Sequence, residues 1–367
     1  MTSSWNAKYG LKRVINASGR MSILGVSAPS DTVMEAMKRG GQQYVEIADL
    51  VDKAGDYISG ILGSEAAVVV NSASSGIALS VAALVTKGNR RLSERLHQEP
   101  IAANEVIMLK GHNVQYGAPV ETMVYLGGGR LIEVGYANEG KAFHIEDAIG
   151  PNTAAILYVK SHHCVQKNMI SVDEAWEVAR RSGIPLIVDA AAEEDLQKYV
   201  QCSDLAIYSG SKAIEGPTSG IVGGKRRYVG WLKTQLHGIG RSMKVGKESV
   251  FGLLQALDEY AAKKDNSERE KAALQSLMPL NDIPGVRVSI VQDEAGRAIY
   301  RARVSIDPAA SGTTAVRVAE GLQRGEIAIY TRDYGVKQGY FDIDPRPLQG
   351  DDIEVIASRI RELTGGH

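Results

Sequence analysis

An acid and a lysine follow two apolar runs in the middle of the chain. Asp189 ends the run that begins at Leu186, and Lys212 follows a second run, Leu205 to Tyr208, among small residues. If the two runs are neighbouring parallel strands, both side chains lie at the carboxyl edge of the sheet, where open α/β folds bind ligands. Pyridoxal 5'-phosphate chemistry requires this pair, because the lysine amine forms a Schiff base with the aldehyde and the carboxylate keeps the ring nitrogen protonated.

A turn of small residues lies upstream, between the β-branched run Ala66 to Val70 and the apolar segment Ile77 to Val85. It contains Ser74, Ser75 and Gly76. A helix that begins here would direct N–H groups and hydroxyls at a phosphate, although a serine-rich helix start is also a common structural cap. Together with the lysine downstream, the turn predicts a site for the cofactor phosphate.

Histidines follow two further strand candidates. His112 comes after Glu105 to Leu109, where its ring could stack on a flat cofactor, although a lone histidine there is more often structural. His162 and His163 precede Cys164 and together suggest a metal site. Adjacent side chains of an extended segment point to opposite faces, however, and no second cluster has ligand spacing, so we predict no metal. A hydrogen bond from one of the two imidazoles to the substrate and a purely structural role both stay open.

Basic side chains elsewhere in the chain could bind an anionic substrate. Arg241, Lys244 and Lys247 stand in a glycine-flanked segment, and Arg332 and Arg346 lie where strands of the C-terminal region should end. Solvated surface charge or structural pairing would explain them equally well. Because an arginine fork matches a carboxylate or a phosphate, we predict the first two for a phosphate and one of the arginines for a carboxylate.

Strand and helix candidates alternate from residue 66 to residue 224. The clearest helix runs from Ser171 to Ser182, because Ser171 and Glu174 form a capping box. This alternation predicts an α/β fold, a mostly parallel mixed sheet with helices on both faces, followed by a smaller α+β domain. The expected divisions are an N-terminal arm (1–30), a cofactor-binding large domain (31–255), a linking helix (256–283) and a small C-terminal domain (284–367).

The composition excludes several classes of function. The chain has 367 residues with 42 Lys and Arg against 43 Asp and Glu, so no net charge favours nucleic acid or an anionic membrane. No run is long enough to span a membrane, and the N-terminus lacks the apolar core of a signal peptide. Two cysteines, Cys164 and Cys202, are too few for a disulfide framework. We therefore predict a cytoplasmic protein that binds neither nucleic acid nor membrane.

Several strings resemble a known family. Ser209-Gly210-Ser211-Lys212, followed by Gly216-Pro217 and Gly220-Ile221, resembles the selenocysteine synthase branch of fold-type-I pyridoxal-phosphate enzymes, whose motif reads S-G-D-K, then G-G-P and G-I-I. In this chain Ser211 replaces the aspartate, and Glu215 precedes the Gly-Pro pair. These departures argue against the synthase reaction itself.

The chain more closely resembles the D-glucosaminate-6-phosphate ammonia-lyase group of that branch, over nearly its whole length. The strings that carry this resemblance are 23–27, 109–113, 158–167 and 188–195. The resemblance implies pyridoxal phosphate as cofactor and a dehydrating α,β-elimination that converts D-glucosaminate 6-phosphate to 2-keto-3-deoxy-6-phosphogluconate and ammonia. It also implies a homodimer or a larger homo-oligomer.

The implied reaction assigns roles to the candidate residues. Lys212 would take the C2 proton, Asp189 would face the ring nitrogen, and Ser209 would join the phosphate turn. His112, and either His162 or His163, are the candidate donors of the proton that the leaving C3 hydroxyl needs. A racemase or an eliminase acting on another amino acid would use the same lysine and acid, and a non-catalytic partner-binding or transfer-RNA-linked protein on this fold is the alternative from another class.

Overall fold

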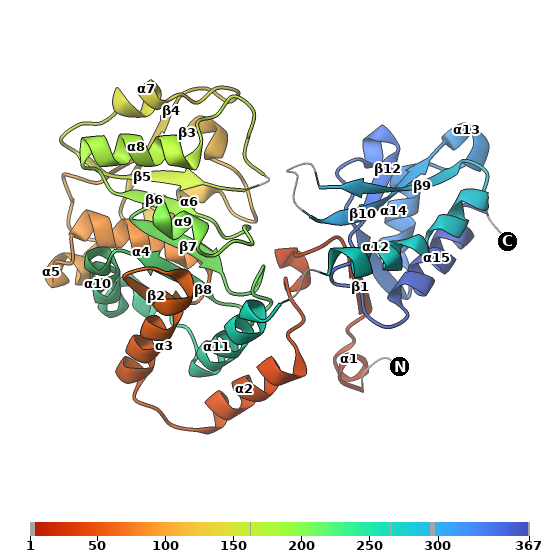
Figure 1. Cartoon of the computed structure of the whole chain (residues 1–367), viewed down its shortest axis with the longest axis horizontal. Coiled ribbons are helices and arrows are strands. Elements are labelled where there is room, and N and C mark those ends of the chain that lie inside the picture. Colours follow the sequence, from red (N-terminus) through yellow and green to blue (C-terminus); the bar gives the residue numbers. More distant parts are fainter. Residues whose placement is uncertain (1–3, 162, 264–265, 294–297, 366–367) are drawn as a thin grey trace. The chain divides into compact units, whose positions relative to one another are not determined.

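The computed structural model describes residues 4–161, 163–263, 266–293 and 298–365. The chain forms two compact units (Figure 1). The large unit comprises residues 27–262, and the small unit combines the residues up to Val26 with those from Lys263 onward.

A seven-stranded mixed sheet is the centre of the large unit. Its strand order is β2-β8-β7-β6-β5-β3-β4. The neighbours from β4 to β7 pair in parallel, whereas β8 is antiparallel to both β7 and β2. All strands except β8 therefore end at the same carboxyl edge, as the sequence predicted. The strands are β2 Ala66–Val70, β3 Glu105–Leu109, β4 Arg130–Val134, β5 Thr153–Val159, β6 Leu186–Asp189, β7 Leu205–Ser209 and β8 Gly220–Gly224.

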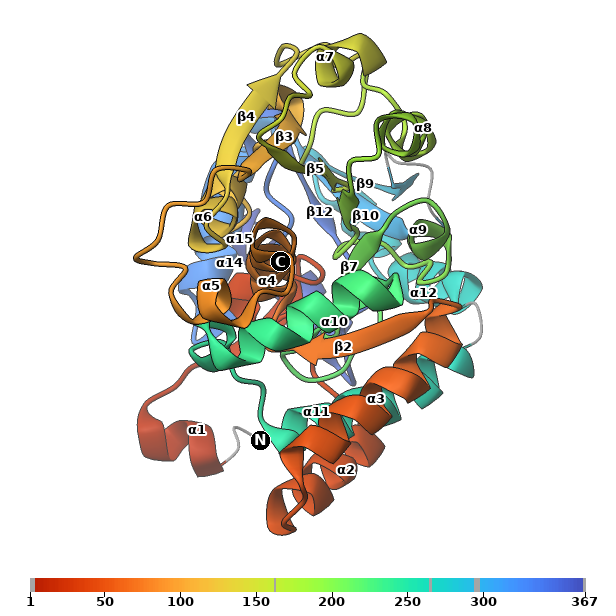
Figure 2. The same cartoon turned by 90° about the vertical axis from the view of Figure 1, so that its left-hand side faces the viewer.

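Helices cover both faces of this sheet (Figure 2). One apolar layer packs side chains of α3, α8 and α11 against the strands, and the opposite layer packs α4, α6 and α10. Among the described helices, none combines the length and the apolar composition needed to cross a bilayer. The helices of this unit are α2 Asp31–Gln42, α3 Ile47–Leu62, α4 Ala73–Thr86, α5 Arg90–Glu94, α6 Val120–Leu126, α7 Ala142–Glu146, α8 Val172–Ser182, α9 Lys198–Gln201, α10 Arg226–Thr234 and α11 Lys247–Ala261, with 3₁₀ turns η2 Lys110–His112, η3 Gln235–His237 and η4 Ile239–Arg241.

Helix α4 is buried on all sides. Every residue from Ser75 to Thr86 is buried, which agrees with a sequence that is apolar all round instead of on one stripe. At Gly76 an added Cβ would come within 2.9 Å of the Ile207 side chain. Glycine at this position therefore lets the start of α4 approach the sheet closely.

The small unit combines two sheets with helices. The antiparallel sheet has the order β12-β10-β9, and β1 pairs in parallel with β11. Side chains from both sheets share one core with α12, α14 and α15. The elements are α1 Ser4–Tyr9, β1 Arg13–Ala17, η1 Ser22–Leu24, α12 Ser267–Gln275, η5 Met278–Asp282, β9 Val286–Gln292, β10 Tyr300–Ile306, α13 Pro308–Ser311, α14 Ala315–Arg324, β11 Ile327–Thr331, η6 Val336–Gln338, β12 Tyr340–Ile343 and α15 Asp352–Leu363.

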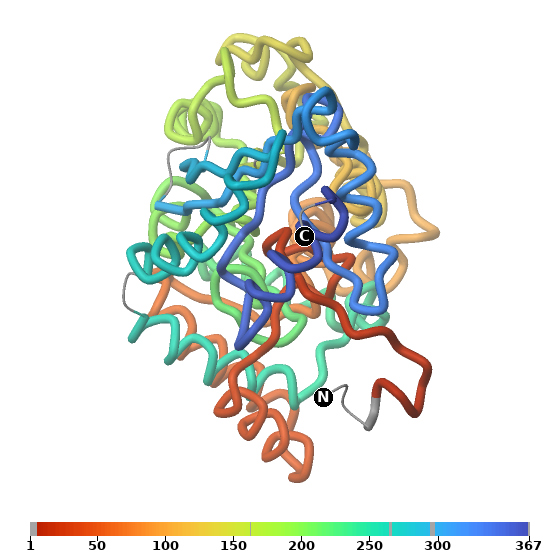
Figure 3. Tube along the Cα trace, turned by 90° about the vertical axis from the view of Figure 1, so that its right-hand side faces the viewer, coloured from red at the N-terminus to blue at the C-terminus, as the bar shows by residue number. Residues whose placement is uncertain are grey.

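The N-terminal arm expected over residues 1–30 is largely part of the small unit. Ile15 and Ala17 of β1 are buried in its core, and each residue of β1 has a partner in β11. Figure 3 shows the N-terminal segment running beside the C-terminal part of the chain. The arm has too few apolar residues to form a core alone. Its partner strand lies about 310 residues away, so the sequence of the arm could not predict this pairing.

The linking helix expected over residues 256–283 was wrong as a single element. Helix α11 ends at Ala261, α12 runs from Ser267 to Gln275, and η5 follows it. The two helices belong to different units. The sequence between them, Lys263 to Asn266, has no apolar side chain that packing against a core could hold in a continuous helix.

Candidate active site

Asp189 and Lys212 lie at the carboxyl edge of the seven-stranded sheet. Asp189 is the last residue of β6 and is only 9% exposed. Its Oδ1 accepts a hydrogen bond of 3.1 Å from the Ala191 backbone N–H. Lys212 lies in the turn that begins directly after the neighbouring strand β7. Parallel pairing of β6 and β7 therefore brings the acid and the lysine to the same edge, as expected from their spacing.

The electrostatics of the pair are unusual because burial acts on both groups. Burial raises the pKa of Asp189, and the Ala191 amide and Lys212 lower it in part. Burial lowers the pKa of the Lys212 amine, which the charge of Asp189 partly restores. Among the described residues, no cationic side chain lies within ion-pair distance of the Asp189 carboxylate. The site therefore combines an amine that loses its proton readily with a buried acid that lacks a cation.

The serines at the start of α4 are only partly available to a ligand. Ser72 caps the helix, and the Ser75 side chain completes a capping box by accepting from the Ser72 N–H at 3.1 Å. The Ser75 hydroxyl also donates to the Ser72 carbonyl at 2.8 Å. In the described chain, no acceptor binds the backbone N–H groups of Ala73 and Ser74. These two amides and the half-buried Ser74 side chain are the groups that point to an anion site.

Ser209 ends β7, between the strand that carries Asp189 and the turn that carries Lys212. Its Oγ lies 3.3 Å from the Ser211 Oγ. Three residues beyond the lysine, Glu215 has a φ of +60°, in the left-handed region that favours glycine. This is the position where the resembled selenocysteine synthase motif carries glycine, the residue that most easily adopts a left-handed backbone.

His112 is buried to 1% exposure in the 3₁₀ turn after β3. The Val159 N–H donates to its Nδ1 at 3.4 Å, and its ring contacts the Tyr158 ring edge-on with centroids 4.5 Å apart. Burial, with a smaller effect from the charge of Lys160, lowers the pKa of His112 to about 4. The imidazole is therefore neutral near pH 7, which suits a packing or stacking group better than a proton donor.

The two other histidines belong to the loop after β5. His163 is exposed, and its backbone N–H donates to the Ser161 Oγ at 3.2 Å. His162 lies outside the described residues. Across the described part of the chain, no three His, Cys, Asp or Glu side chains converge as they would around a metal ion.

No described hydrogen bond or ion pair connects the basic segment between α10 and α11 to Asp189 or Lys212. Arg241 and Lys244 are both exposed. The nearby Lys247, by contrast, has a clear structural role, since its Nζ donates to the carbonyls of Gly40 and Gly41 at 2.7 Å each, at the end of α2. The sequence had suggested that all three cations could bind anions, and for Lys247 this helix-end capping explains the charge.

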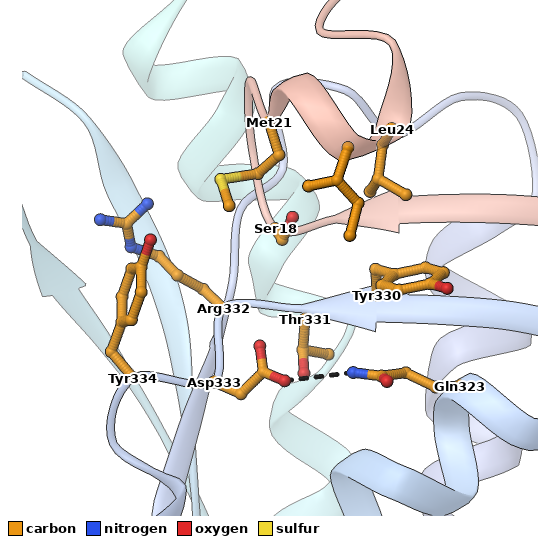
Figure 4. A pocket seen from close by; sticks show the side chains of 10 residues that line it. Ser18, Met21, Leu24, Gln323, Tyr330, Thr331, Arg332, Asp333 and Tyr334 are labelled. Atoms are coloured by element: carbon orange, nitrogen blue, oxygen red, sulfur yellow. Dashed lines mark hydrogen bonds between the residues drawn. The ribbon is translucent and has the colours of Figure 1, made fainter. Parts of the chain in front are cut away.

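The two candidate arginines of the small unit differ sharply. The Arg346 guanidinium donates two hydrogen bonds to the Asp344 carboxylate, from Nε to Oδ1 at 2.9 Å and from Nη2 to Oδ2 at 2.7 Å. Arg332 has no described carboxylate within ion-pair distance, and its guanidinium lies 5.0 Å from the centre of the Tyr334 ring (Figure 4). Burial and the neighbouring charge of Arg301 lower the pKa of Arg332.

Arg332 lines a cavity within the small unit. Its volume is about 210 Å³, and Ser18 and Met21 of the N-terminal segment form another wall (Figure 4). A half-buried cation without an acid partner beside a cavity is an arrangement that an anion would complete. Of the two arginines, the structure therefore leaves Arg332 available for a ligand.

Tyr116 was missed by the sequence interpretation. It follows His112 in the same loop, and its ring packs against the apolar layer that contains α4. Its hydroxyl is buried, and burial raises the pKa of Tyr116, whereas a hydrogen bond with the Ser74 side chain lowers it in part. No signal in the sequence distinguishes this tyrosine from the fourteen others, because its position depends on how the loop folds back on α4.

The fold and the site together define the class of protein. A mixed sheet with helices on both faces, a half-buried lysine after β7 and a buried acid after β6 define a fold-type-I pyridoxal-phosphate enzyme, a fold that solved aminotransferases share. The residues fit this cofactor, because a protonated ring nitrogen would supply the cation that Asp189 lacks and a neutral Lys212 could bind the aldehyde.

Comparison with known proteins identifies the family. The family model described as "SelA: L-seryl-tRNA selenium transferase" matches residues 14–297. The chain therefore belongs to this family. It is 46% identical to the D-glucosaminate-6-phosphate ammonia lyase of Salmonella typhimurium, over 99% of this chain and 98% of that protein.

Two further similarities complete the comparison. A solved structure described as that of D-glucosaminate-6-phosphate ammonia-lyase matches with a TM-score of 0.93 and 44% identity, over 100% of this chain and 99% of that one. The 5'-C-glycyluridine monooxygenase-decarboxylase of a Streptomyces species is 38% identical, over 100% of this chain and 94% of that protein. The family therefore includes more than one chemical outcome on a similar chain.

Proposed function

We propose that this protein is a pyridoxal-phosphate-dependent ammonia-lyase that converts D-glucosaminate 6-phosphate to 2-keto-3-deoxy-6-phosphogluconate and ammonia. The observation that carries the proposal is the full-length similarity to a lyase of that name, at 46% identity. Lys212 and Asp189 support it, because a lysine whose pKa is lowered and a buried acid are the groups that the cofactor requires.

Pyridoxal phosphate, when bound, supplies an aldehyde for the amine and a ring that accepts electrons from C2. Lys212 would hold the cofactor through its amine and, once the substrate amine has taken its place, would accept the proton from C2. Asp189 keeps the ring nitrogen protonated, and its burial among apolar strands strengthens this interaction. Loss of the C2 proton to Lys212 would accompany cleavage of the C3–O bond, and a protein donor would protonate the departing hydroxyl, which leaves as water. The enamine released from the site would tautomerise to an imine, whose hydrolysis by one water gives the keto acid and ammonia.

The proton donor in this proposal is His163. The pKa of His112, lowered to about 4, argues against that residue as donor and favours a place against the cofactor ring. His163 is exposed in the loop after β5, at the edge where β6 ends in Asp189. The adjacent His162 is assigned a hydrogen bond to the substrate.

Serines and basic residues hold the anionic groups in this proposal. Ser74 and the first amides of α4, with Ser209, hold the cofactor phosphate, while Ser75 and Gly76 shape the helix start. Arg332 binds the substrate carboxylate, because no described acid neutralises it. Arg346 is left out of this role by its two bonds to Asp344.

Arg241 and Lys244 are proposed for the 6-phosphate of the substrate. Their exposure and charge support this role. A homodimer or a larger homo-oligomer and a cytoplasmic location belong to the same proposal. The scarcity of cysteine supports the location.

The proposal is tested by incubating the purified protein with pyridoxal phosphate and a panel of phosphorylated and free amino-sugar acids. Keto acid and ammonia should form in equal amounts, fastest with D-glucosaminate 6-phosphate. Inversion at C2 without ammonia would instead indicate a racemase. Consumption of dioxygen with release of carbon dioxide would indicate chemistry like that named for the Streptomyces relative.

A non-catalytic role would be indicated by protein that never develops the absorbance of lysine-bound pyridoxal phosphate, roughly 410–430 nm. Added cofactor should produce this band within the mixing time of a binding experiment if Lys212 reacts as proposed. Near-neutral net charge already argues against a nucleic-acid partner.

A further inference from the structure

The cavity of the small unit is lined by two opposite charges that do not pair with each other. Its volume is about 210 Å³, and Arg332 and Asp333 both line it. Although these residues are adjacent in the chain, Figure 4 shows the Arg332 guanidinium beside the Tyr334 ring and the Asp333 carboxylate beside the Gln323 amide. The cavity therefore offers a cation and an acid at separate positions.

The Asp333 carboxylate is half-buried and has one hydrogen-bond partner in the described chain. The Gln323 Nε2 donates to its Oδ2 at 3.1 Å. Among the described residues, no cationic side chain lies within ion-pair distance of Asp333, whereas Asp342 and Asp344 of the same unit bind Arg303 and Arg346. An ionised carboxylate can accept about four hydrogen bonds, so Asp333 keeps free acceptor positions beside the cavity.

Backbone bonds on both sides hold Asp333 in place. The Arg332 N–H donates to the Asp342 carbonyl at 2.8 Å, and the Asp342 N–H donates to the Arg332 carbonyl at 3.0 Å. On the other side, the Val336 N–H donates to the Asp333 carbonyl at 3.2 Å. A group that is already fixed loses little conformational freedom when it binds a ligand, so this carboxylate is preorganised.

The chemistry of the proposed substrate determines which groups such a carboxylate could bind. Arg332 is assigned the substrate carboxylate and the cofactor takes the amine, so the remaining neutral donors are hydroxyls. A carboxylate can accept one hydroxyl on each oxygen in strong, charge-assisted hydrogen bonds. The C3 hydroxyl has to gain a proton as it leaves, whereas the C4 and C5 hydroxyls are unchanged by the reaction. The latter two are therefore the hydroxyls that suit Asp333.

We propose that Asp333 accepts hydrogen bonds from the C4 and C5 hydroxyls of the substrate and so selects polyhydroxylated amino acids. The inference rests on the proposed function and names a specificity-determining residue for it. A cavity of about 210 Å³ holds several water molecules, and so a short segment of a sugar chain. Substrates without these hydroxyls bind less tightly, because they leave the carboxylate without the donors that water had supplied.

Binding of two unreactive ligands to the holoenzyme tests this assignment without turnover. D-Gluconate 6-phosphate lacks the amine but keeps the hydroxyls, whereas the phosphate ester of 6-hydroxyhexanoate keeps only the carboxylate and the phosphate. Asp333→Asn retains an oxygen for Gln323 and removes the charge. By calorimetry, its Kd for D-gluconate 6-phosphate should rise roughly tenfold or more, as expected for hydrogen bonds to a charged group. Its Kd for the hexanoate ester should not rise.

Steady-state kinetics supply a second readout on Asp333→Asn. Its KM for D-glucosaminate 6-phosphate should rise roughly tenfold while kcat stays nearly unchanged, because bonds to the C4 and C5 hydroxyls are equally strong in the ground state and the transition state. A fall in kcat at unchanged KM would instead place the carboxylate at the leaving C3 hydroxyl and would overturn the assignment.

Asp307→Asn is the matched control. Asp307 is an exposed acid of the same unit that lies outside this cavity, and it accepts from the Ala309 N–H at 3.0 Å. Asparagine also caps helices well, so both Kd values and both kinetic constants should stay unchanged. Arg332→Gln should weaken the binding of both ligands alike, because both keep the carboxylate.

Two results would overturn the inference while ammonia release from D-glucosaminate 6-phosphate upholds the proposed function. Asp333→Asn could bind D-gluconate 6-phosphate as tightly as the unmodified protein, or it could lose equal affinity for both ligands, which would show that Asp333 acts only through the shape of the cavity. Failure of the unmodified protein to release ammonia from any amino-sugar acid would overturn the proposed function, and the inference with it.

Discussion

Buried charges are paired in one region of the molecule and unpaired in another. They form ion pairs in the charged cluster of the small unit, but not at the carboxyl edge of the seven-stranded sheet. In the small unit, Arg301 bonds Asp293 at 2.9 Å and Asp344 at 3.1 Å, and Arg346 completes the coordination of Asp344. At the sheet edge, the buried Asp189 and the half-buried Lys212 have no ion pair among the described residues. A buried charge without a partner is costly, so it persists where a ligand completes it.

Arg332 is the exception that makes this contrast useful. It lies close enough to Arg301 for the two charges to interact, yet only Arg301 has described acid partners. Within one unit, therefore, Arg301 forms ion pairs with acids of the chain, and the neighbouring Arg332 is available to bind a ligand. The predictions below test whether unpartnered charge marks function and paired charge marks stability.

The largest effect is expected at Lys212. Lys212→Ala should reduce turnover by roughly 10⁴-fold, because it removes both the cofactor attachment and the base. Treatment with borohydride should trap pyridoxal phosphate on the unmodified protein only. Lys225→Ala is the control, since Lys225 pairs with Asp204 near the opposite ends of these strands and should not affect turnover. A trapped adduct on Lys212→Ala would contradict the assignment.

Asp189→Asn should retain the cofactor but lose turnover by roughly 10²- to 10³-fold, because an amide cannot keep the ring nitrogen protonated. The apoprotein should become more stable to urea, since the change removes a buried charge with a raised pKa and no ion pair. Asp204→Asn is the matched control. Asp204 is also buried, but it binds the Leu186 N–H at 2.9 Å and Lys225 at 3.5 Å, so its loss should lower stability and spare turnover.

Arg301→Gln and Arg332→Gln should have opposite consequences. The first breaks a buried ion cluster and should lower the free energy of unfolding of the small unit by about 3 to 5 kcal/mol. The second should leave stability nearly unchanged and raise KM by roughly tenfold, because it removes a bond to the substrate carboxylate. Urea titration and steady-state kinetics on both variants provide the comparison. An equal loss of stability in both would abolish the distinction between the two arginines.

The smallest effect concerns His112, which is buried as a neutral group. Its pKa is about 4 in the folded chain and 6.5 as the ordinary value, so the unfolded chain binds more protons between these pH values. The His112 contribution to the free energy of unfolding is therefore at its maximum above pH 6.5. It falls by about 3 kcal/mol as the pH drops to about 4. His112→Phe should lack this part of the acid destabilisation when unfolding is measured across that range. If the free energy of unfolding depended on pH in the same way in the two proteins, His112 would not be buried as described.

Much of the large unit could be predicted from its sequence. The strands at Ala66–Val70 and Glu105–Leu109 have the predicted bounds, because β-branched runs between turn residues carry a strong local signal. Ser171 and Glu174 form the predicted capping box at the start of α8. The meeting of Asp189 and Lys212 followed from parallel pairing alone, since a carboxyl edge collects the ends of successive strands.

The features that sequence could not supply depend on distant contacts. The helix expected from residue 256 to 283 is divided because its two halves pack in different units. Lys247 could not be separated from Arg241 until its bonds to the carbonyls of Gly40 and Gly41 were known. For the same reason Arg332 and Arg346 had equal standing in the sequence, and only the position of Asp344 distinguishes them.

The parallel pairing of β1 with β11 also sets an order of events during synthesis. β1 ends at Ala17 and its partner begins at Ile327, so about 310 residues are made before the pair can form. At typical elongation rates this takes roughly 15 to 60 s. The large unit is one continuous segment of the chain and can fold in that interval. Ile15 and Ala17 have no core to pack into until the rest of the small unit has been made. A nascent chain of this protein is therefore expected to expose a short apolar strand to chaperones until its last hundred residues emerge.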